Sequence, residues 1–131
     1  MKLLLDTHIW LWSQLDPRRL KKRVASALIR PGNELWLSPI SIWETLLLAD
    51  KGRLRIKGDP VCWISTLLEK VPMKEANLTH EVAKTSRKVW LPHEDPADRF
   101  LAATADVFNL VLVTGDVNLL KGKGFRTLAN A

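Results

Sequence analysis

Residues 2–8 read KLLLDTH, a short apolar run that ends abruptly in a carboxylate. Three consecutive leucines without polar alternation are typical of a strand that is buried on both faces of a parallel sheet. Asp6 follows the last leucine directly, so we expect it at the carboxyl edge of this strand. Because ligands bind beyond the carboxyl ends of the strands in open α/β sheets, Asp6 is the first candidate for a functional residue.

The rest of the chain alternates strand and helix patterns in the same way. Further strands are predicted at LWL (35–37), VPM (71–73), LVLVT (110–114) and FRTL (125–128). Helices are predicted to begin at the Asp-Pro or Ser-Pro pairs of positions 16, 38, 59 and 95, and after Thr79, because these residues cap a helix and proline fits its first turn. Strands separated by helices pair in parallel and are covered on both faces. We therefore expect an α/β fold, a three-layer α/β/α sandwich around a parallel sheet of about four to five strands.

Composition and charge limit the class of protein. The chain has 131 residues, 47% of them apolar, which predicts one domain over residues 1–131. Lys and Arg outnumber Asp and Glu by 20 to 14, and the net charge of +6 favours a polyanionic partner such as nucleic acid, or an acidic protein. No apolar run approaches the ~20 residues of a membrane span, and no signal peptide is visible. The single cysteine, Cys62, is interpreted as a small core residue, and a cytoplasmic location is expected.

Two further carboxylates occupy positions that resemble that of Asp6. Asp116 follows LVLVTG and belongs at the same edge of the sheet; for either Asp, the alternative is a cap on the next helix or turn. Glu44 lies in PISIWETLLLA, among apolar and hydroxylated residues. A carboxylate on a largely buried helix is costly unless it is paired or bound to a metal. The alternative for Glu44 is an ion pair with a Lys or Arg.

A fourth carboxylate lies in HEDPADRFLAATA, residues 93–105. Asp95 is predicted to cap the helix, which leaves Asp98 in its first turn beside the apolar stripe. A purely structural Asp98 remains open, since a carboxylate there gains ~0.3–1 kcal/mol from the helix dipole. Arg99 is free to pair with Asp95, with Asp98 or with a phosphate, and the sequence does not decide between them.

Four acids gathered in one cleft would repel one another unless a cation compensates their charge. Oxygen ligands of this kind select Mg²⁺ or Mn²⁺, and the chain offers no cysteine cluster or pair of histidines for zinc. Divalent ions held by carboxylates activate water and stabilise leaving oxygens in phosphodiester hydrolysis. A basic surface around such a site would hold a nucleic-acid backbone.

Four segments taken together, LLLDTHIWLW, LSPISIWE, DPADRFLAATA and LVLVTGD, resemble the PIN-domain ribonucleases of the VapC type, the toxins of type II toxin–antitoxin systems. The resemblance runs essentially from end to end. It implies an endoribonuclease dependent on Mg²⁺ or Mn²⁺, a homodimer, and a small antitoxin that blocks the site. The catalytic and metal-binding acids of the family map onto positions that the residues had already singled out: Asp6, Glu44, Asp98 and Asp116.

The resemblance also implies supporting residues around these acids. Thr7 matches the hydroxyl residue that often follows the first acid, and Thr114 matches the hydroxyl near the last one. Arg99 follows the third acid and is counted with them as a supporting residue. Ala97 stands where phenylalanine is more frequent in the family, a difference that concerns packing alone.

Basic and aromatic residues are candidates for contacts with RNA or the antitoxin. RRLKKR (18–23) contributes Arg18, Arg19, Lys21 and Lys22, which are unfavourable in the first turns of a helix, although a solvated surface is the alternative. KGRLRIK (51–57) is expected as a loop or edge segment near the groove. The tryptophans and the remaining histidines are interpreted structurally: Trp36, Trp43 and Trp90 as core, Trp10 and Trp12 as core or dimer packing, and His80 and His93 as surface residues.

The leading hypothesis is thus a metal-dependent endoribonuclease with RNA as its substrate. The alternative is a non-catalytic module on the same fold that binds nucleic acid or an antitoxin, which the presence of all four acids disfavours. A phosphatase with Asp6 as nucleophile is disfavoured because His8 occupies the place of the expected second Asp.

Overall fold

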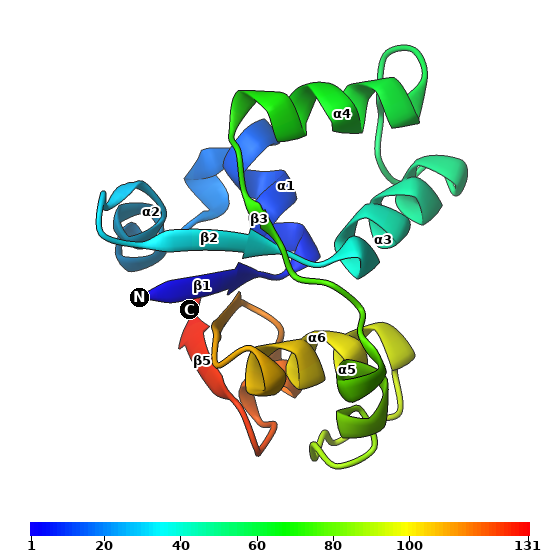
Figure 1. Ribbon diagram of the computed structural model, residues 1–131. Helices are drawn as coiled ribbons and strands as arrows, with labels where there is room; N and C mark the ends of the chain where they lie inside the picture. The colour runs from blue at the N-terminus through cyan, green and yellow to red at the C-terminus, as the bar shows by residue number, and fades with distance from the viewer.

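Five parallel strands form the centre of the computed structural model, which describes all 131 residues. Helices cover both faces of this sheet (Figure 1), so the predicted three-layer sandwich is confirmed. The strands are β1 (Lys2–Leu5), β2 (Glu34–Leu37), β3 (Lys74–Glu75), β4 (Val111–Thr114) and β5 (Arg126–Ala129). The helices are α1 (Thr7–Leu15), α2 (Lys22–Ile29), α3 (Pro39–Asp50), α4 (Pro60–Lys70), α5 (His80–Thr85), α6 (Pro96–Val107) and α7 (Val117–Leu120), with one 3₁₀ turn, η1 (Pro17–Arg19).

The strand order β3-β2-β1-β4-β5 places β1 at the centre of the sheet. The chain first builds outward from β1 to β2 and β3, and then returns to add β4 and β5 on the other side. The order therefore reverses between β1 and β4, and such switch points are where ligands bind in open α/β sheets. Leu4 pairs with Trp36 of β2 and with Leu112 of β4, so the carboxyl ends of β1 and β4 lie side by side.

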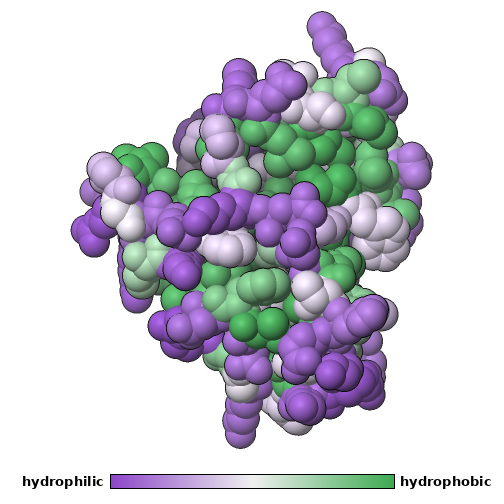
Figure 2. All heavy atoms as spheres, in the orientation of Figure 1, coloured by the Kyte–Doolittle hydropathy of each residue, from purple (hydrophilic) through white to green (hydrophobic).

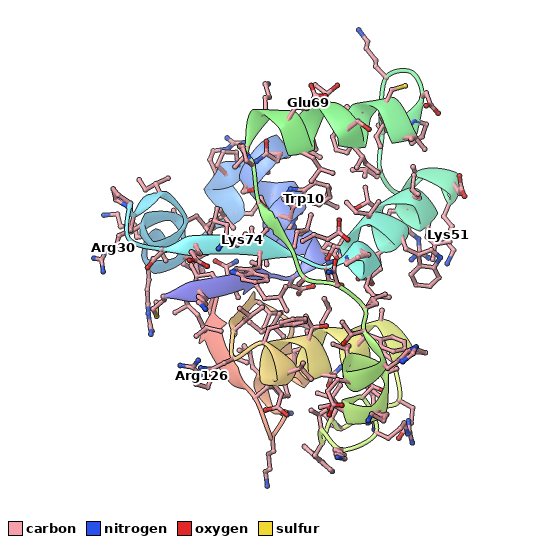
Figure 3. All side chains as sticks on the ribbon, viewed as in Figure 1. Trp10, Arg30, Lys51, Glu69, Lys74 and Arg126 are labelled. Atoms are coloured by element: carbon pink, nitrogen blue, oxygen red, sulfur yellow. The ribbon has the colours of Figure 1, made fainter.

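Two apolar clusters hold the layers together, one on each face of the sheet. Leu3 and Leu5 of β1 face the cluster that α1, α2 and α4 cover, whereas Leu4 faces the cluster under α6 and α7. Trp10 of α1 is 1% exposed and is the largest fully buried side chain (Figure 3). Burying a side chain of this kind stabilises the fold by roughly 1.5–3 kcal/mol.

The predicted helix starts agree with the structure at four of the five positions. Ser38, Asp59, Thr79 and Asp95 each cap a helix, because each side chain accepts a hydrogen bond from a backbone N–H of the first turn. The helix predicted from Pro17 is instead split into η1 and α2. The third strand is Lys74–Glu75 and not residues 71–73, which fits a two-residue edge strand that only β2 pairs.

Several residues interpreted as core lie at the surface. Cys62 is exposed, because the first turn of α4 points it away from the cluster that Ile64 enters. Trp43 and Trp90 are 52% and 51% exposed, and so their assignment to the core was wrong. Helix α3 is apolar on more than one face, and no element of this chain covers the face that carries Trp43. No helix is of a length and apolarity suited to crossing a membrane.

Candidate active site

The carboxyl edge of the sheet carries an acidic cavity of about 400 Å³. All four acids singled out in the sequence line it, and they come from four different parts of the chain. Asp6 follows β1, Asp116 follows β4, Glu44 projects from the middle of α3, and Asp98 from the first turn of α6. The other lining residues are Asp95, His8, Trp12 and Gly115. The structure therefore brings together side chains that are up to 110 positions apart in the sequence.

Asp6 and Asp116 are joined by the hydroxyl of Thr114. Thr114 is fully buried and donates a hydrogen bond of 2.7 Å to Oδ2 of Asp6, while its oxygen accepts one of 3.0 Å from the backbone N–H of Asp116. The Asp6 carboxylate caps no helix, although α1 begins directly after it. Asp116 does cap α7, through a 2.8 Å hydrogen bond from Asn118 N–H to Oδ1, so the capping alternative holds for Asp116 alone.

Glu44 is held by a hydroxyl and not by a cation. Thr7 Oγ1 donates a 2.6 Å hydrogen bond to Glu44 Oε1 and lies 2.9 Å from the hydroxyl oxygen of Ser41. Glu44 forms no ion pair with Lys or Arg, so that alternative was wrong. Burial raises its pKa above the usual range, and the negative charges of Asp6 and Asp95 raise it further.

Asp98 is buried next to a histidine. Asp95 caps α6 by accepting a 3.2 Å hydrogen bond from the Asp98 N–H, as predicted, and this fixes the first turn of the helix. Oδ2 of Asp98 lies 3.0 Å from Nε2 of His93. His93 is partly exposed, so its interpretation as a surface residue missed only this contact; its place five residues before the acid, in HEDPAD, was the signal. Burial, followed by repulsion from Asp95, Asp116 and Asp6, raises the pKa of Asp98 to about 7.

The cavity carries an excess of negative charge that the chain itself does not neutralise. Burial also raises the pKa of Asp6, and none of the four acids pairs with a Lys or Arg. A donor set made of carboxylate oxygens fits a hard divalent cation. No three of the His, Cys, Asp and Glu side chains are close enough to enclose an ion by themselves. The set fits an ion such as Mg²⁺, which keeps several waters and uses few protein ligands.

Arg99 lies outside this cavity, although it is the neighbour of Asp98. Its Nη1 donates to the carbonyls of Ser86 and Val89 at 3.1 and 3.2 Å, and its Nη2 donates to Glu94 at 2.9 Å. Asp95 and Asp98 are therefore not its partners, and its carboxylate partner is Glu94. Arg99 connects the segment after α5 to α6, and so it supports the site by stabilising the fold around it.

None of the basic residues of 18–23 lines the cavity, and Arg19 lies against a residue that does. Arg18, Arg19, Lys21 and Lys22 are all exposed. Arg18 pairs with Asp16, whereas the Arg19 guanidinium lies 4.7 Å from the ring centre of Trp12, a cavity residue. On the other side of the acids, a second cavity of about 350 Å³ contains Lys51 and Arg53 of the other basic stretch, in agreement with its expected place near the groove.

Comparisons with known proteins found relatives of this chain. The family model described as PIN domain matches residues 3–124. Ribonuclease VapC22 of Mycobacterium tuberculosis is 36% identical over 120 residues, which are 89% of this chain and 88% of that protein.

Solved structures share the fold at lower sequence identity. VapBC2 from Rickettsia felis, bound to a DNA fragment from its promoter, has a TM-score of 0.73 and 14% identity, with 98% of each chain covered. VapBC-5 from Mycobacterium tuberculosis, a member of the VapBC family of toxin–antitoxin systems, has a TM-score of 0.61 and 16% identity, again with 98% of each chain covered.

Proposed function

The chain belongs to the PIN-domain family, among the VapC-type ribonucleases, and from this membership we propose that it is a divalent-metal-dependent endoribonuclease that hydrolyses RNA. One observation carries the proposal beyond membership. Asp6, Glu44, Asp98 and Asp116 line one cavity, and no Lys or Arg neutralises them. A buried group of like charges is costly for folding, and a bound Mg²⁺ or Mn²⁺ would remove that cost.

The four acids have different expected roles, which follow from their surroundings. Asp6, Asp98 and Asp116 would hold the metal together with bound waters, since no three of these side chains enclose an ion alone, and the metal would supply a water of lowered pKa and stabilise charge on the phosphate. Glu44 is a further ligand or orients the attacking water, and burial, which raises its pKa, makes it a stronger base than an exposed carboxylate. Thr114 and Thr7 fix the orientation of Asp6 and Glu44, as hydrogen bonds do for ligating carboxylates in metal sites.

The biological setting of this activity is a toxin–antitoxin pair. VapBC-5, which shares the fold, is a member of such a system, and the relative VapC22 is a ribonuclease. A small antitoxin that blocks the acidic cavity is therefore the expected protein partner of this chain. The net charge of +6 suits both an RNA substrate and an acidic partner.

A homodimer is supported by the exposed apolar surface between α3 and α4. Figure 2 shows apolar side chains gathered there, over a cavity of about 480 Å³ lined by Leu37, Pro39, Ile42, Trp43, Leu46, Leu68 and Met73 among others. Trp43, 52% exposed, stands at this surface. Light scattering after gel filtration should give twice the chain mass for the wild type and a lower mass for Trp43→Gln; a monomeric wild type would contradict the dimer.

The direct test is cleavage. Purified protein is incubated with total cellular RNA with and without Mn²⁺, and the new 5′ ends are mapped. Cleavage that requires Mn²⁺ and is lost in Asp6→Asn supports the proposal. A protein that binds RNA but leaves it intact in Mn²⁺ and in Mg²⁺ would instead be a non-catalytic binding module.

A further inference from the structure

The segment between α1 and α2 is fixed to the far end of the chain by one side chain. Oδ1 of Asn130 accepts a 2.7 Å hydrogen bond from the backbone N–H of Lys21, and its Nδ2 donates to the carbonyl of Arg19 at 3.1 Å. Asn130 is itself fixed, since its backbone N–H donates to the carbonyl of Thr114 at 2.8 Å. The basic segment is thereby tied to the residue that holds Asp6.

These contacts explain why the predicted helix from Pro17 is interrupted. A continuous helix would use the carbonyl of Arg19 and the N–H of Lys21 in its own hydrogen bonds. Asn130 binds both groups, and so the chain forms η1, an extended Leu20 and then α2. The interruption fixes the backbone of Arg19 beside the acidic cavity instead of leaving this residue within a helix.

The side chain of Arg19 lies over a residue of the acidic cavity. Its guanidinium lies 4.7 Å from the ring centre of Trp12, and Trp12 lines the acidic cavity together with Asp6 and His8. Arg19 is exposed and forms no ion pair, whereas the adjacent Arg18 pairs with Asp16 at 3.3 Å. A guanidinium stacked on a ring keeps its N–H groups free at the edge, where they can form the two parallel hydrogen bonds that a phosphate accepts.

We propose that Arg19, held on Trp12 and positioned by Asn130, binds the phosphate of a nucleotide that neighbours the scissile one. The proposal rests on the ribonuclease function proposed above. RNA presents a row of negative charges, and the acidic cavity repels every phosphate that a metal ion does not neutralise. A cation fixed at the cavity wall attracts the next phosphate and so sets the position of the strand across the metal site.

Binding to a labelled RNA tests this assignment, with Arg18 as the matched control. A fluorescein-labelled single-stranded RNA of ten nucleotides is titrated in EDTA, where no cleavage occurs, at several salt concentrations. Arg19→Ala should weaken binding about tenfold, as expected for a lost charge-assisted hydrogen bond, and reduce the slope of log K against log salt by about 0.7–1. Arg18→Ala should stay within about twofold of the wild type, because the Arg18 side chain is 92% exposed and its ion pair with Asp16 does not hold it at the cavity.

The positioning role of Asn130 has a separate readout. Asn130→Ala should weaken RNA binding only while Arg19 is present, so that Arg19→Ala/Asn130→Ala binds no more weakly than Arg19→Ala alone. A merely structural Asn130 would give additive losses. Thermal unfolding of each variant confirms that the folded protein is compared, and Arg19→Lys, which keeps the charge but not the planar fork, should recover only part of the affinity.

The outcomes separate this proposal from the proposed function. Equal RNA affinity of Arg19→Ala and Arg18→Ala, in a wild type that cleaves RNA, overturns the role of Arg19 and leaves the ribonuclease standing. Unchanged RNA affinity together with lost binding to a polyglutamate peptide would assign Arg19 to an acidic protein partner and also overturns the proposal. A wild type that neither binds nor cleaves RNA overturns both.

Discussion

Two consecutive residues of α6, Asp98 and Arg99, are equally buried at 9% exposure, but their charges have opposite surroundings. Arg99 donates hydrogen bonds to two carbonyls and to Glu94, so its charge is compensated. Asp98 faces a cavity of other carboxylates, where only His93 moderates the repulsion. The difference indicates that a buried charge compensated by its partners serves the fold, whereas a buried charge among like charges marks a candidate binding site for a cation.

This difference has an energetic consequence for the metal-free protein. Each charge in the acidic cavity reduces stability, because burial and mutual repulsion disfavour the ionised forms. The surroundings of Arg99 have no such cost, apart from its Nε, which has no hydrogen-bond partner. Removing a charge from the acidic cavity should therefore raise the stability of the metal-free protein, whereas removing the charge of Arg99 should lower it.

The largest effect is expected for Asp6→Asn. Cleavage of RNA in Mn²⁺ should fall by at least about 100-fold, because a group that stabilises transition-state charge typically contributes that much. Stability in EDTA should stay the same or rise, since the amide oxygen still accepts the Thr114 hydrogen bond and a repelled charge is gone. Cleavage assays and thermal melts of the same preparation measure both.

The control for Asp6→Asn is Asp106→Asn, on the exposed side of α6. It removes the same charge and should change neither activity nor melting temperature appreciably. If Asp6→Asn keeps its activity, or unfolds more easily in EDTA than the wild type, then Asp6 is a structural residue like Arg99. The contrast between the acidic cavity and the surroundings of Arg99 would then be wrong.

Arg99→Met should show the opposite profile. The carbonyls of Ser86 and Val89 would lose their donors, and so unfolding in urea should become easier by about 2–6 kcal/mol, at ~1–3 kcal/mol for each unsatisfied buried group. Cleavage per folded molecule should stay within a few-fold of the wild type, because Arg99 lies outside the acidic cavity. A folded Arg99→Met protein that has lost all cleavage would place Arg99 in the site after all.

In the absence of metal, the stability of the protein should depend on pH. The pKa of Asp98 is raised to about 7 from the value of 3.8 that it has when unperturbed. The native state therefore binds more protons than the unfolded state between these values, and the free energy of unfolding should fall as the pH rises through that window. Between pH 5 and 8 in EDTA we expect a loss on the order of 1–2 kcal/mol.

Mn²⁺ should reverse this trend, because it competes with protons for the same carboxylates and binds only the native state appreciably. The melting temperature in millimolar Mn²⁺ should thus exceed that in EDTA by more at pH 8 than at pH 5. Asp98→Asn is the control and should flatten the pH dependence in EDTA. A metal-free protein whose stability rises from pH 5 to pH 8 would contradict the repulsion between the acids.

The sequence was sufficient to predict the fold and the grouping of the acids, because both depend on local patterns. KLLL and LVLVT are continuous apolar strands, and parallel pairing sends Asp6 and Asp116 to the same edge. The resemblance of the four segments to the PIN-domain ribonucleases pointed to the same acids. Glu44 was recognised because a carboxylate is out of place on an apolar helix.

The residues that the sequence misjudged depend on tertiary structure that periodicity and capping patterns do not show. His93 reaches Asp98 only through the path of the loop before α6, and the partners of Arg99 lie on the segment after α5. Asn130 splits the helix predicted from Pro17 by bonds that span 109 and 111 positions. Trp43 is apolar and yet exposed, because periodicity does not show whether a second face of a helix will find a cover within the same chain.

A smaller effect is expected where a hydroxyl only orients an acid. Thr114→Val removes the donor to Asp6 and the acceptor of the Asp116 N–H while keeping the volume of the side chain. Mn²⁺ affinity, measured by calorimetry, should fall about tenfold, the lower end of what outer-shell partners contribute. Thr127→Val on β5, an exposed position, is the matched control and should bind Mn²⁺ as the wild type does. An unchanged Mn²⁺ affinity of Thr114→Val would mean that Asp6 does not need the Thr114 hydrogen bond in order to bind the metal.

The smallest effect is expected for Arg87→Ala, which tests whether the ion pair with Glu94 or burial accounts for the contribution of Arg99 to stability. Arg87 and Arg99 both contact Glu94, at 3.2 and 2.9 Å, but the Arg87 side chain is 69% exposed and that of Arg99 only 11%. Exposed ion pairs are screened by water and salt, so the melting temperature should change by less than about 2 °C. A loss as large as that of Arg99→Met would mean that Glu94 must be held by both arginines, and that the ion pairs, more than the buried carbonyl contacts, fix the segment before α6. A negligible change in melting temperature would mean that burial, more than pairing with Glu94, makes Arg99 more important for stability than Arg87. Burial likewise distinguishes the acids of the cavity from the surface carboxylates.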